Sequence, residues 1–177
     1  TNSGGAIPSD IIDSTTTYAN IVGRDVSMII DSDGFKHVAY YAGFQGNTLR
    51  YATDASGSWV TTDITSGGNF NYGTSIAIDS NGAVHISSSR AFGSGQAYNN
   101  LRYVTCSSSC SSASSWTITT IETGNLGHNA EIAVDSSDIL HIAYGNKTST
   151  NTYSLRYATC SSSCTSASSW TKLHIDQ

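Results

Sequence analysis

The sequence predicts an all-β fold, a β-propeller of four-stranded antiparallel blades, with three full blades and one extra N-terminal strand in this chain. One observation is a segment of the form S-I-A-I-D-S-N-G-A-V-H, at residues 75–85, which recurs from residues 27 and 131. A second is the segment L-R-Y-[AV]-T, which follows each copy. The unit is about 50 residues long and consists of short alternating segments bounded by turn residues, which fits four strands per repeat.

The composition fits this class and argues against others. Charged residues make up 12% of the chain, and the hydrophobic 38% is spread in short runs among Ser, Thr, Gly and Asn. Ten Tyr and three Trp provide the aromatic surface that an ordered core needs. With a net charge of −5 and eight Lys and Arg, the chain offers no basic patch, so we predict no nucleic-acid partner. No apolar run approaches the ~18–20 residues that cross a bilayer, so we predict no membrane span.

The chain is predicted to divide into five parts. Residues 1–8 form a tail, because Gly4, Gly5 and Pro8 oppose a regular element. Residues 9–24 hold an extra outer strand, at residues 9–13, and a polar loop. The three blades cover residues 25–64, 74–122 and 130–177.

Each blade is expected to contain four strands in sequence order. The first strands lie at residues 26–31, 74–79 and 131–135, and the second begin at His37, His85 and His141. The third are the Leu-Arg-Tyr segments at residues 49–53, 101–105 and 155–159, and the fourth begin at Trp59, Trp116 and Trp170. Variable loops are expected between the second and third strands, at residues 42–47, 90–100 and 145–154.

The four cysteines stand in the last hairpins of blades 2 and 3, as Cys106, Cys110, Cys160 and Cys164. Both members of the pair are missing from the shorter hairpin of blade 1, which predicts two local disulfides, 106–110 and 160–164. A zinc site is the alternative, but its usual spacing is C-x2-C and the flanks lack further ligands. Disulfides indicate an oxidising compartment, so we predict an extracellular or cell-surface protein. The glycosylation sequon at Asn146 fits this location.

The blade resembles that of the sialidase-like propellers, whose Asp-box hairpin reads S-x-D-x-G-x-T-W. Residues 53–59, TDASGSW, keep the Asp, Gly and Trp of that box with a shifted spacing, and the cysteine hairpins replace it in blades 2 and 3. The resemblance extends over nearly the whole chain at blade level and implies a propeller. It does not imply an activity. Sialidases use arginines at non-repeated positions and a Tyr paired with a Glu, whereas the Leu-Arg-Tyr arginines of this chain recur in every blade and no motif joins a Tyr to a Glu.

Residues that recur in every blade are interpreted as structural. The histidines of the second strands are expected to bond to a neighbouring blade rather than to a metal. Arg50, Arg102 and Arg156 are expected to pair with Asp31, Asp79 and Asp135 or with turn carbonyls. The turns at residues 31–34 and 79–82 resemble calcium loops but lack the later acidic ligands, so we interpret them as hairpin turns. We predict no cofactor, no metal site and no catalytic residue.

Candidate ligand-binding residues lie in the variable loops and in the loops that join one blade to the next, which emerge together on one face of a propeller. They are Arg24, Phe44, Asn71, Tyr72, Arg90, Phe92, Gln96, Tyr98, His128 and Asn129. Aromatic rings among Asn, Gln and Arg suit sugars, and the same mixture also suits protein interfaces. The sequence therefore predicts a non-catalytic binding or adhesion module with a glycan-type ligand. The alternatives are a structural subunit of a cell-surface assembly that uses edge-strand pairing, and a fragment of a sialidase-like glycosidase.

The number of blades predicts a partner. A propeller ring closes with about four to eight blades, and this chain supplies three. Either the chain is a piece of a longer protein, or copies associate through their end blades and residues 9–13. Two chains would form a six-bladed ring, and open-ended association would form a polymer.

Overall fold

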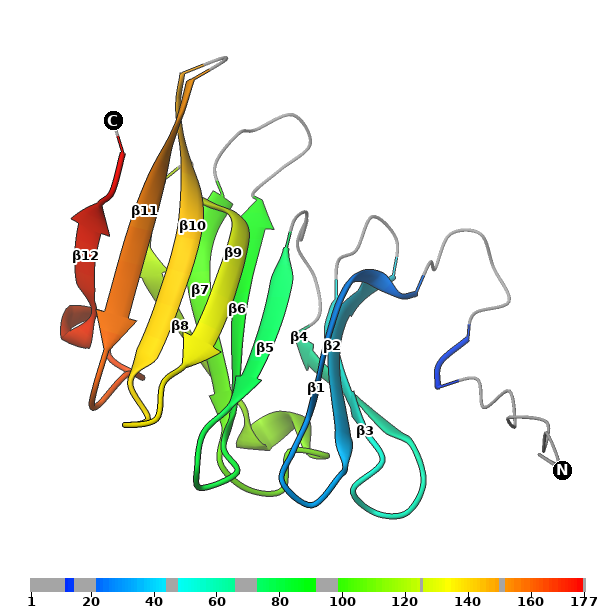
Figure 1. Cartoon of the computed structure of the whole chain (residues 1–177). Coiled ribbons are helices and arrows are strands. Elements are labelled where there is room, and N and C mark those ends of the chain that lie inside the picture. The colour runs from blue at the N-terminus through cyan, green and yellow to red at the C-terminus, as the bar shows by residue number, and fades with distance from the viewer. Residues whose placement is uncertain are drawn as a thin grey trace, which may run out of the picture.

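The computed structural model describes residues 12–14, 22–43, 48–65, 73–91, 99–124, 126–149 and 152–176. In these residues it confirms the predicted fold class: twelve strands form three four-stranded antiparallel sheets, accompanied by two short 3-10 turns, Ala113–Ser115 and Ala167–Ser169 (Figure 1). No helix that is long and apolar enough to span a bilayer occurs in this described part of the chain.

Each sheet is one blade, with its strands in sequence order. Blade 1 contains β1 (Arg24–Ile30), β2 (Lys36–Ala42), β3 (Thr48–Thr53) and β4 (Val60–Thr65). Blade 2 contains β5 (Thr74–Ile78), β6 (Val84–Ala91), β7 (Asn99–Cys106) and β8 (Thr117–Glu122). Blade 3 contains β9 (Leu126–Val134), β10 (Leu140–Ser149), β11 (Thr152–Cys160) and β12 (Thr171–His174).

The prediction of a loop at residues 145–154 is wrong. β10 and β11 continue through this segment as a long hairpin, in which Gly145 pairs with Leu155 and Lys147 pairs with Tyr153. Side chains that pair across the two strands stabilise the hairpin here, although the segment is rich in polar residues. The hairpin extends beyond the other strands of the chain (Figure 1).

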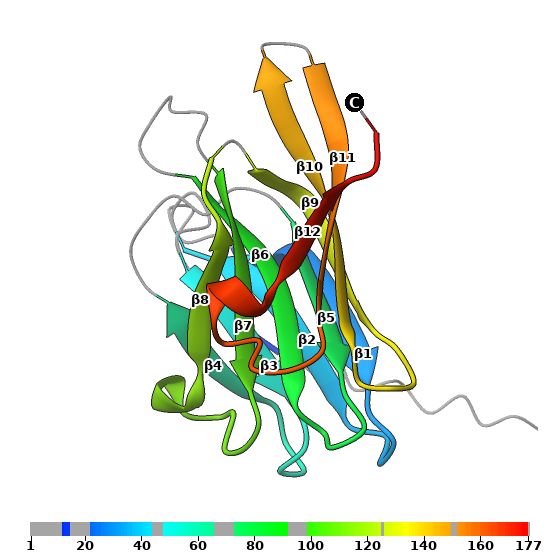
Figure 2. The same cartoon turned by 90° about the vertical axis from the view of Figure 1, so that its left-hand side faces the viewer.

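The three sheets pack face to face, and β5 contacts both β1 and β9, so the first strands of the blades lie side by side (Figures 1 and 2). Apolar side chains fill both junctions. The junction of blades 1 and 2 buries Tyr41, Leu49, Tyr51, Ile76, Ile86 and Trp116, and the junction of blades 2 and 3 buries Leu101, Tyr103, Ile121, Ile132, Ile142 and Trp170. The core of this chain therefore lies between sheets, at equivalent repeat positions.

The turns between the first and second strands of the blades are built on an aspartate. In blade 1 Asp31 Oδ1 accepts hydrogen bonds from the backbone N–H of Asp33, at 3.0 Å, and of Phe35, at 2.9 Å. Gly34 supplies a positive φ of 87°, and blade 3 places Asp138 at that position with a φ of 60°. Asp is one of the residues that tolerate this conformation, so the turn closes without glycine.

Both predicted disulfides are present, Cys106–Cys110 and Cys160–Cys164, with Cα atoms 5.7 Å and 5.8 Å apart. Each closes a hairpin that ends at a tryptophan. Trp116 Nε1 donates to the carbonyl of Cys110, and Trp170 Nε1 donates to that of Cys164, both at 2.9 Å. The disulfide hairpin thus fixes the indole that packs on the neighbouring blade.

Candidate functional site

Each blade contains an Asp, a His and a Tyr side chain that contact one another in series. In blade 1 His37 Nε2 lies 3.0 Å from Asp31 Oδ2, and His37 Nδ1 lies 2.5 Å from the Tyr51 hydroxyl. The equivalent residues are Asp79, His85 and Tyr103 in blade 2 and Asp135, His141 and Tyr157 in blade 3. The prediction that the histidines bond to a neighbouring blade is wrong, because both partners belong to the same blade. These three side chains link the turn after the first strand of a blade to its third strand.

The charges of these Asp and His side chains depend on their hydrogen bonds and on their burial. The hydrogen bond from His37 holds the pKa of Asp31 below its usual value, and backbone N–H groups of Ile139 and Ser137 do the same for the pKa of Asp135. Burial at the junction lowers the pKa of His85, which favours its neutral form.

We expect the free energy of unfolding to decrease as the pH falls. Because the pKa of His85 is lowered in the folded state, the unfolded chain binds the proton first when the pH falls below the ordinary His pKa of about 6.5. The free energy of unfolding therefore decreases below that pH. Asp31 and Asp135 then lose their stabilisation as the pH falls below about 3.8 and through their lowered folded pKa values. Urea denaturation midpoints at about pH 8, 6.5, 5 and 3.5 measure this, with His85→Gln as the control that flattens the change between about pH 7 and 5. An unchanged wild-type midpoint across that interval would contradict the role of His85.

A second cluster crosses the junction of blades 2 and 3. Glu122, at the end of β8, accepts hydrogen bonds from the Tyr144 hydroxyl and from Arg156 Nη1, both at 2.7 Å. The side chains of Glu122 and Arg156 are largely buried. Charge-assisted hydrogen bonds of this kind are stronger than neutral ones and add geometric specificity to the apolar packing of the junction.

Asp13 repeats this cluster on the open side of blade 1. Its Oδ2 accepts from the Tyr40 hydroxyl at 2.8 Å and from Arg50 Nη1 at 2.6 Å, and Arg50 also contacts Asp63 at 2.5 Å. The prediction that Arg50 pairs with Asp31 is wrong, as is the corresponding prediction for Arg156. The turn carboxylates of Asp31 and Asp135 already accept from a histidine and from backbone N–H groups, so Arg50 bonds to Asp13 and Asp63 and Arg156 bonds to Glu122 instead.

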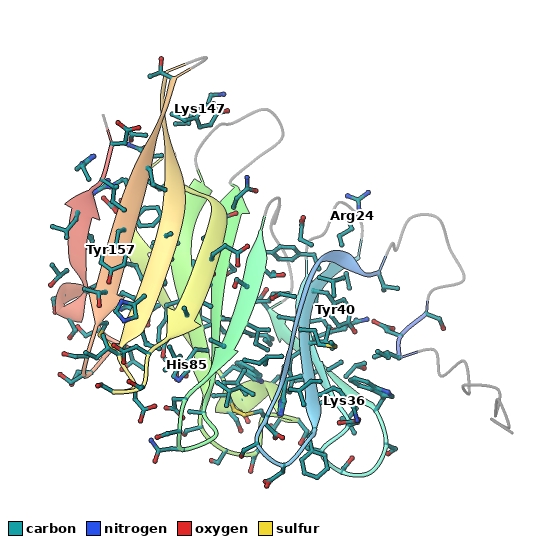
Figure 3. All side chains as sticks on the ribbon, in the orientation of Figure 1. Arg24, Lys36, Tyr40, His85, Lys147 and Tyr157 are labelled. Atoms are coloured by element: carbon teal, nitrogen blue, oxygen red, sulfur yellow. A yellow bond between two sulfur atoms is a disulfide. The ribbon has the colours of Figure 1, made fainter. Side chains whose placement is uncertain are left out.

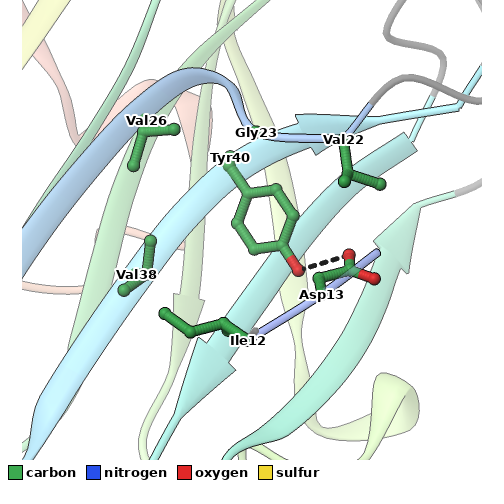
Figure 4. Close-up of a pocket in the computed structure, with 7 residues that line it drawn as sticks. All are labelled: Ile12, Asp13, Val22, Gly23, Val26, Val38 and Tyr40. Carbon is green, nitrogen blue, oxygen red and sulfur yellow. Dashed lines mark hydrogen bonds between the residues drawn. The ribbon is translucent and has the colours of Figure 1, made fainter. Parts of the chain in front are cut away.

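A cavity of about 350 Å³ lies beside Asp13 (Figure 4). Aliphatic side chains form most of its wall, and the hydrogen-bonded pair of Asp13 and Tyr40 forms one polar corner. Burial raises the pKa of Tyr40, so that its hydroxyl stays protonated and donates to Asp13. The lining residues are Ile12, Asp13, Val22, Gly23, Val26, Val38 and Tyr40.

A second cavity, of about 480 Å³, lies between the β3–β4 hairpin of blade 1 and the cysteine hairpin of blade 2, and we call it the hairpin groove. Seven of its thirteen lining residues carry a hydroxyl group, and the His37 and Tyr51 rings that line it are almost fully buried. The lining residues are His37, Tyr51, Thr53, Ala55, Ser56, Val60, Gly82, Val84, Ser107, Ser108, Ser109, Cys110 and Ser111.

The hairpin groove exists because neighbouring hairpins differ in length. At the junction of blades 2 and 3 Thr119 Oγ1 donates to the carbonyl of Thr165 in the next cysteine hairpin, at 2.8 Å. The equivalent Thr62 Oγ1 of blade 1 is buried and has no hydrogen-bond partner among the described residues. The hairpins of blades 1 and 2 therefore do not close on each other in the way that those of blades 2 and 3 do.

The structure describes two of the predicted ligand side chains, those of Arg24 and Asn129. Arg24 begins β1, is exposed, and lies toward the end of the sheets from which Lys147 projects, whereas Lys36 and His85 lie toward the other end (Figure 3). Asn129 is exposed in β9 with a φ of 49°, close to Gly73, where an added Cβ would lie 3.1 Å from the Asn129 Cα. Neither residue lines the described cavities.

The other predicted ligand residues are described only in their backbone or not at all. Arg90 lies in β6 opposite Asn100, and His128 lies in β9 opposite Gly145. Phe44, Asn71, Tyr72, Phe92, Gln96 and Tyr98 lie outside the described residues. Asn146 of the sequon lies half-buried in β10 and donates to Ser154 Oγ at 3.4 Å.

No family model and no curated protein matches the chain. Among solved structures it is similar to a fucose lectin from Kordia zhangzhouensis in complex with methyl-fucoside, with a TM-score of 0.52 and 17% identity over 86% of this chain and 99% of that chain. It is also similar to an α-L-arabinofuranosidase from Fusarium graminearum, with a TM-score of 0.56 and 14% identity over 90% of this chain and 53% of that chain. An exo-β-1,3-galactanase from Phanerochaete chrysosporium gives a TM-score of 0.53 and 12% identity over 89% of this chain and 36% of that chain.

These similarities show the propeller-like fold alone, because the identities are low. The chain spans nearly the whole of the lectin chain but about half or less of each of the two enzymes. None of the three is a sialidase, so the predicted resemblance is supported at the level of the propeller and not of that family.

Proposed function

We propose that this chain is a non-catalytic, carbohydrate-binding propeller subunit that acts outside the cell. The observation that carries the proposal is the hairpin groove, a cavity of about 480 Å³ in which hydroxyl-bearing residues lie among aliphatic and small side chains. A sugar presents hydroxyls around apolar C–H faces, and a groove that combines hydroxyl groups with apolar surface matches both. The similarity to a fucose lectin supports this ligand class.

The loop face remains the second candidate surface for the same ligand class. It is the face on which the sequence predicts the ten ligand residues. Of the two whose side chains the structure describes, Arg24 begins β1, Asn129 lies within β9, and both are exposed. The two surfaces lie at opposite ends of the sheets, since the groove is formed by hairpins and Arg24 lies at the other end of β1. Separate variants can therefore test them.

The two disulfides support a location outside the cell, because they persist in an oxidising compartment. The non-catalytic part of the proposal is supported by four of the carboxylates that the structure describes. Asp31 and Asp135 bond to histidines and turn N–H groups, while Asp13 and Glu122 each bond to a Tyr and an Arg. Acids that are hydrogen-bonded in this way, within a blade or between blades, are poorly placed to act on a glycosidic bond.

We expect saturable binding of the wild-type chain on a glycan array, with fucosides as the first candidates. Ala55→Trp fills the hairpin groove from its exposed rim and is expected to weaken binding at least about tenfold, while Ala113→Trp, an exposed alanine outside the groove lining, leaves it unchanged. Loss of binding in Arg24→Ala but not in Ala55→Trp would move the site to the loop face. Absence of saturable binding by the wild type would reject the lectin proposal.

The structural-subunit alternative is favoured by a different observation, the apolar side chains exposed on both end blades. Under that alternative the chain assembles with other copies and shows no glycan binding. The glycosidase alternative predicts turnover of a fluorogenic glycoside, and we expect none from the purified chain.

A further inference from the structure

The outer face of blade 3 exposes residues that are buried at the same repeat positions of the other blades. Leu155 is 45% exposed, whereas Leu49 and Leu101 are 1% and 0% exposed. Ile175 is 58% exposed, whereas Ile64 and Ile121 are 8% and 3% exposed. Figure 2 views the chain from this side, with the sheet of blade 3 in front. In blades 1 and 2 these positions are covered by the sheet of the following blade.

The open face of blade 1 shows the opposite half of the same junction. Met28 is 59% exposed, whereas its counterparts Ile76 and Ile132 are 6% and 7% exposed. Val26 is also exposed, whereas its counterpart Ala130 is buried. Exposed apolar positions that form a contiguous patch mark interaction surfaces.

A polar contact accompanies the apolar ones at both internal junctions. Ser27 Oγ accepts a hydrogen bond from the backbone N–H of Ile76, and Ser75 Oγ accepts one from Ile132, both at 3.2 Å. Blade 3 places the exposed Glu131 at the serine position, and blade 1 offers the backbone N–H of Met28 at the donor position. A carboxylate that accepts from a backbone N–H makes a stronger hydrogen bond than a hydroxyl does.

The cavity beside Asp13 lies at a position of blade 1 that, in blade 3, is filled by side chains of the preceding blade. Its lining residues Val22, Val38 and Tyr40 are the counterparts of Leu126, Ile142 and Tyr144, which are buried in one cluster with Leu101 and Tyr103 of blade 2. The counterparts of Leu101 and Tyr103 on the outer face of blade 3 are Leu155 and Tyr157. The cavity on blade 1, whose wall includes Ile12 and Asp13, thus corresponds in repeat position to Leu155 and Tyr157 on blade 3.

We propose that a second copy of this chain docks the outer face of its blade 3 on the open face of blade 1, and that the reciprocal contact closes a ring of six blades. A second copy is the occupant because both halves of the junction are present in one chain, so that two copies leave neither face uncovered. Glu131 of one copy accepts from Met28 of the other, and Leu155 enters the cavity. The association is independent of glycan binding, so either proposal can fail alone.

Light scattering tests the proposal. The wild type is expected to have twice the chain mass of 18.6 kDa, and Met28→Glu and Leu155→Glu each to weaken association at least about 100-fold and give monomers. Ile118→Glu, a change at a similarly exposed apolar residue away from both end faces, is expected to leave the dimer intact. Circular dichroism shows that each variant is folded.

A mixture of the two monomeric variants separates this head-to-tail contact from other dimers. Met28→Glu keeps an intact blade 3 face and Leu155→Glu keeps an intact blade 1 face, so an equimolar mixture is expected to regain a two-chain species. A wild-type monomer or an open polymer would overturn the closed ring. Disruption by only one of the two substitutions, or a mixture that stays monomeric, would overturn the head-to-tail contact.

Discussion

Replacement of Trp170 by Ala is expected to lower the free energy of unfolding by about 3–5 kcal/mol, the range for large buried aromatic side chains. Trp170 is buried, lies with its ring centroid 5.2 Å from that of Tyr103 in the neighbouring blade, and donates to the carbonyl of Cys164. Its loss leaves a void at the junction of blades 2 and 3 and an unpaired carbonyl in the hairpin. Urea denaturation followed by circular dichroism measures the change.

Trp59→Ala is the matched control, because Trp59 occupies the same repeat position on the open face of blade 1 and is only partly buried. We expect it to lower the free energy of unfolding by about half as much. Both substitutions are best measured in the Leu155→Glu background, so that association between chains does not contribute. Equal losses for the two tryptophans would show that junction packing is not what Trp170 contributes.

Replacement of Glu122 by Ala is expected to lower the free energy of unfolding by about 2–4 kcal/mol. Arg156 and Tyr144 share this carboxylate as hydrogen-bond acceptor, and both are largely buried at the junction. Without Glu122 the guanidinium remains buried beside a hydroxyl that has lost its acceptor. The same denaturation measurement, made in the Leu155→Glu background, gives the value.

Two variants bracket this result. Glu122→Gln keeps an oxygen acceptor but removes the charge, so we expect a loss about half as large. Glu131→Ala removes an exposed glutamate from blade 3 and is expected to change the free energy of unfolding by less than about 0.5 kcal/mol in this background. A loss for Glu122→Ala as small as that for Glu131→Ala would mean that the cluster does not hold the two blades together.

The parts of the fold that could be predicted from the sequence are those that the blades repeat. The positions of His85, Tyr103 and Trp116 recur, so strand order and the local disulfides followed from comparing one copy with the next. Strand ends were predicted less well. β9 begins at Leu126 rather than near residue 131, because Asn129 adopts a positive φ and lets the strand continue through an irregular register.

The candidate sites could not be predicted because they depend on differences between neighbouring blades. Arg156 bonds to Glu122 at the end of β8 in the preceding blade, Arg50 bonds to Asp13 in the N-terminal segment, and no local motif links either pair. One available signal was an acid that follows an isoleucine at the end of these segments. The hairpin groove likewise depends on a short hairpin lying beside a long one in space.

The hydrogen bonds of Asp13 have a consequence for how the chain could regulate its own assembly. By its place in the repeat, Asp176 is the counterpart of Glu122, so a docked second copy would offer Asp176 to the same Tyr40 and Arg50 that Asp13 already occupies. Asp13 belongs to the same chain and therefore competes at an effective concentration on the order of millimolar. In that ring the N-terminal segment acts as a tethered competitive inhibitor, and the midpoint of assembly is set by how readily this segment gives way.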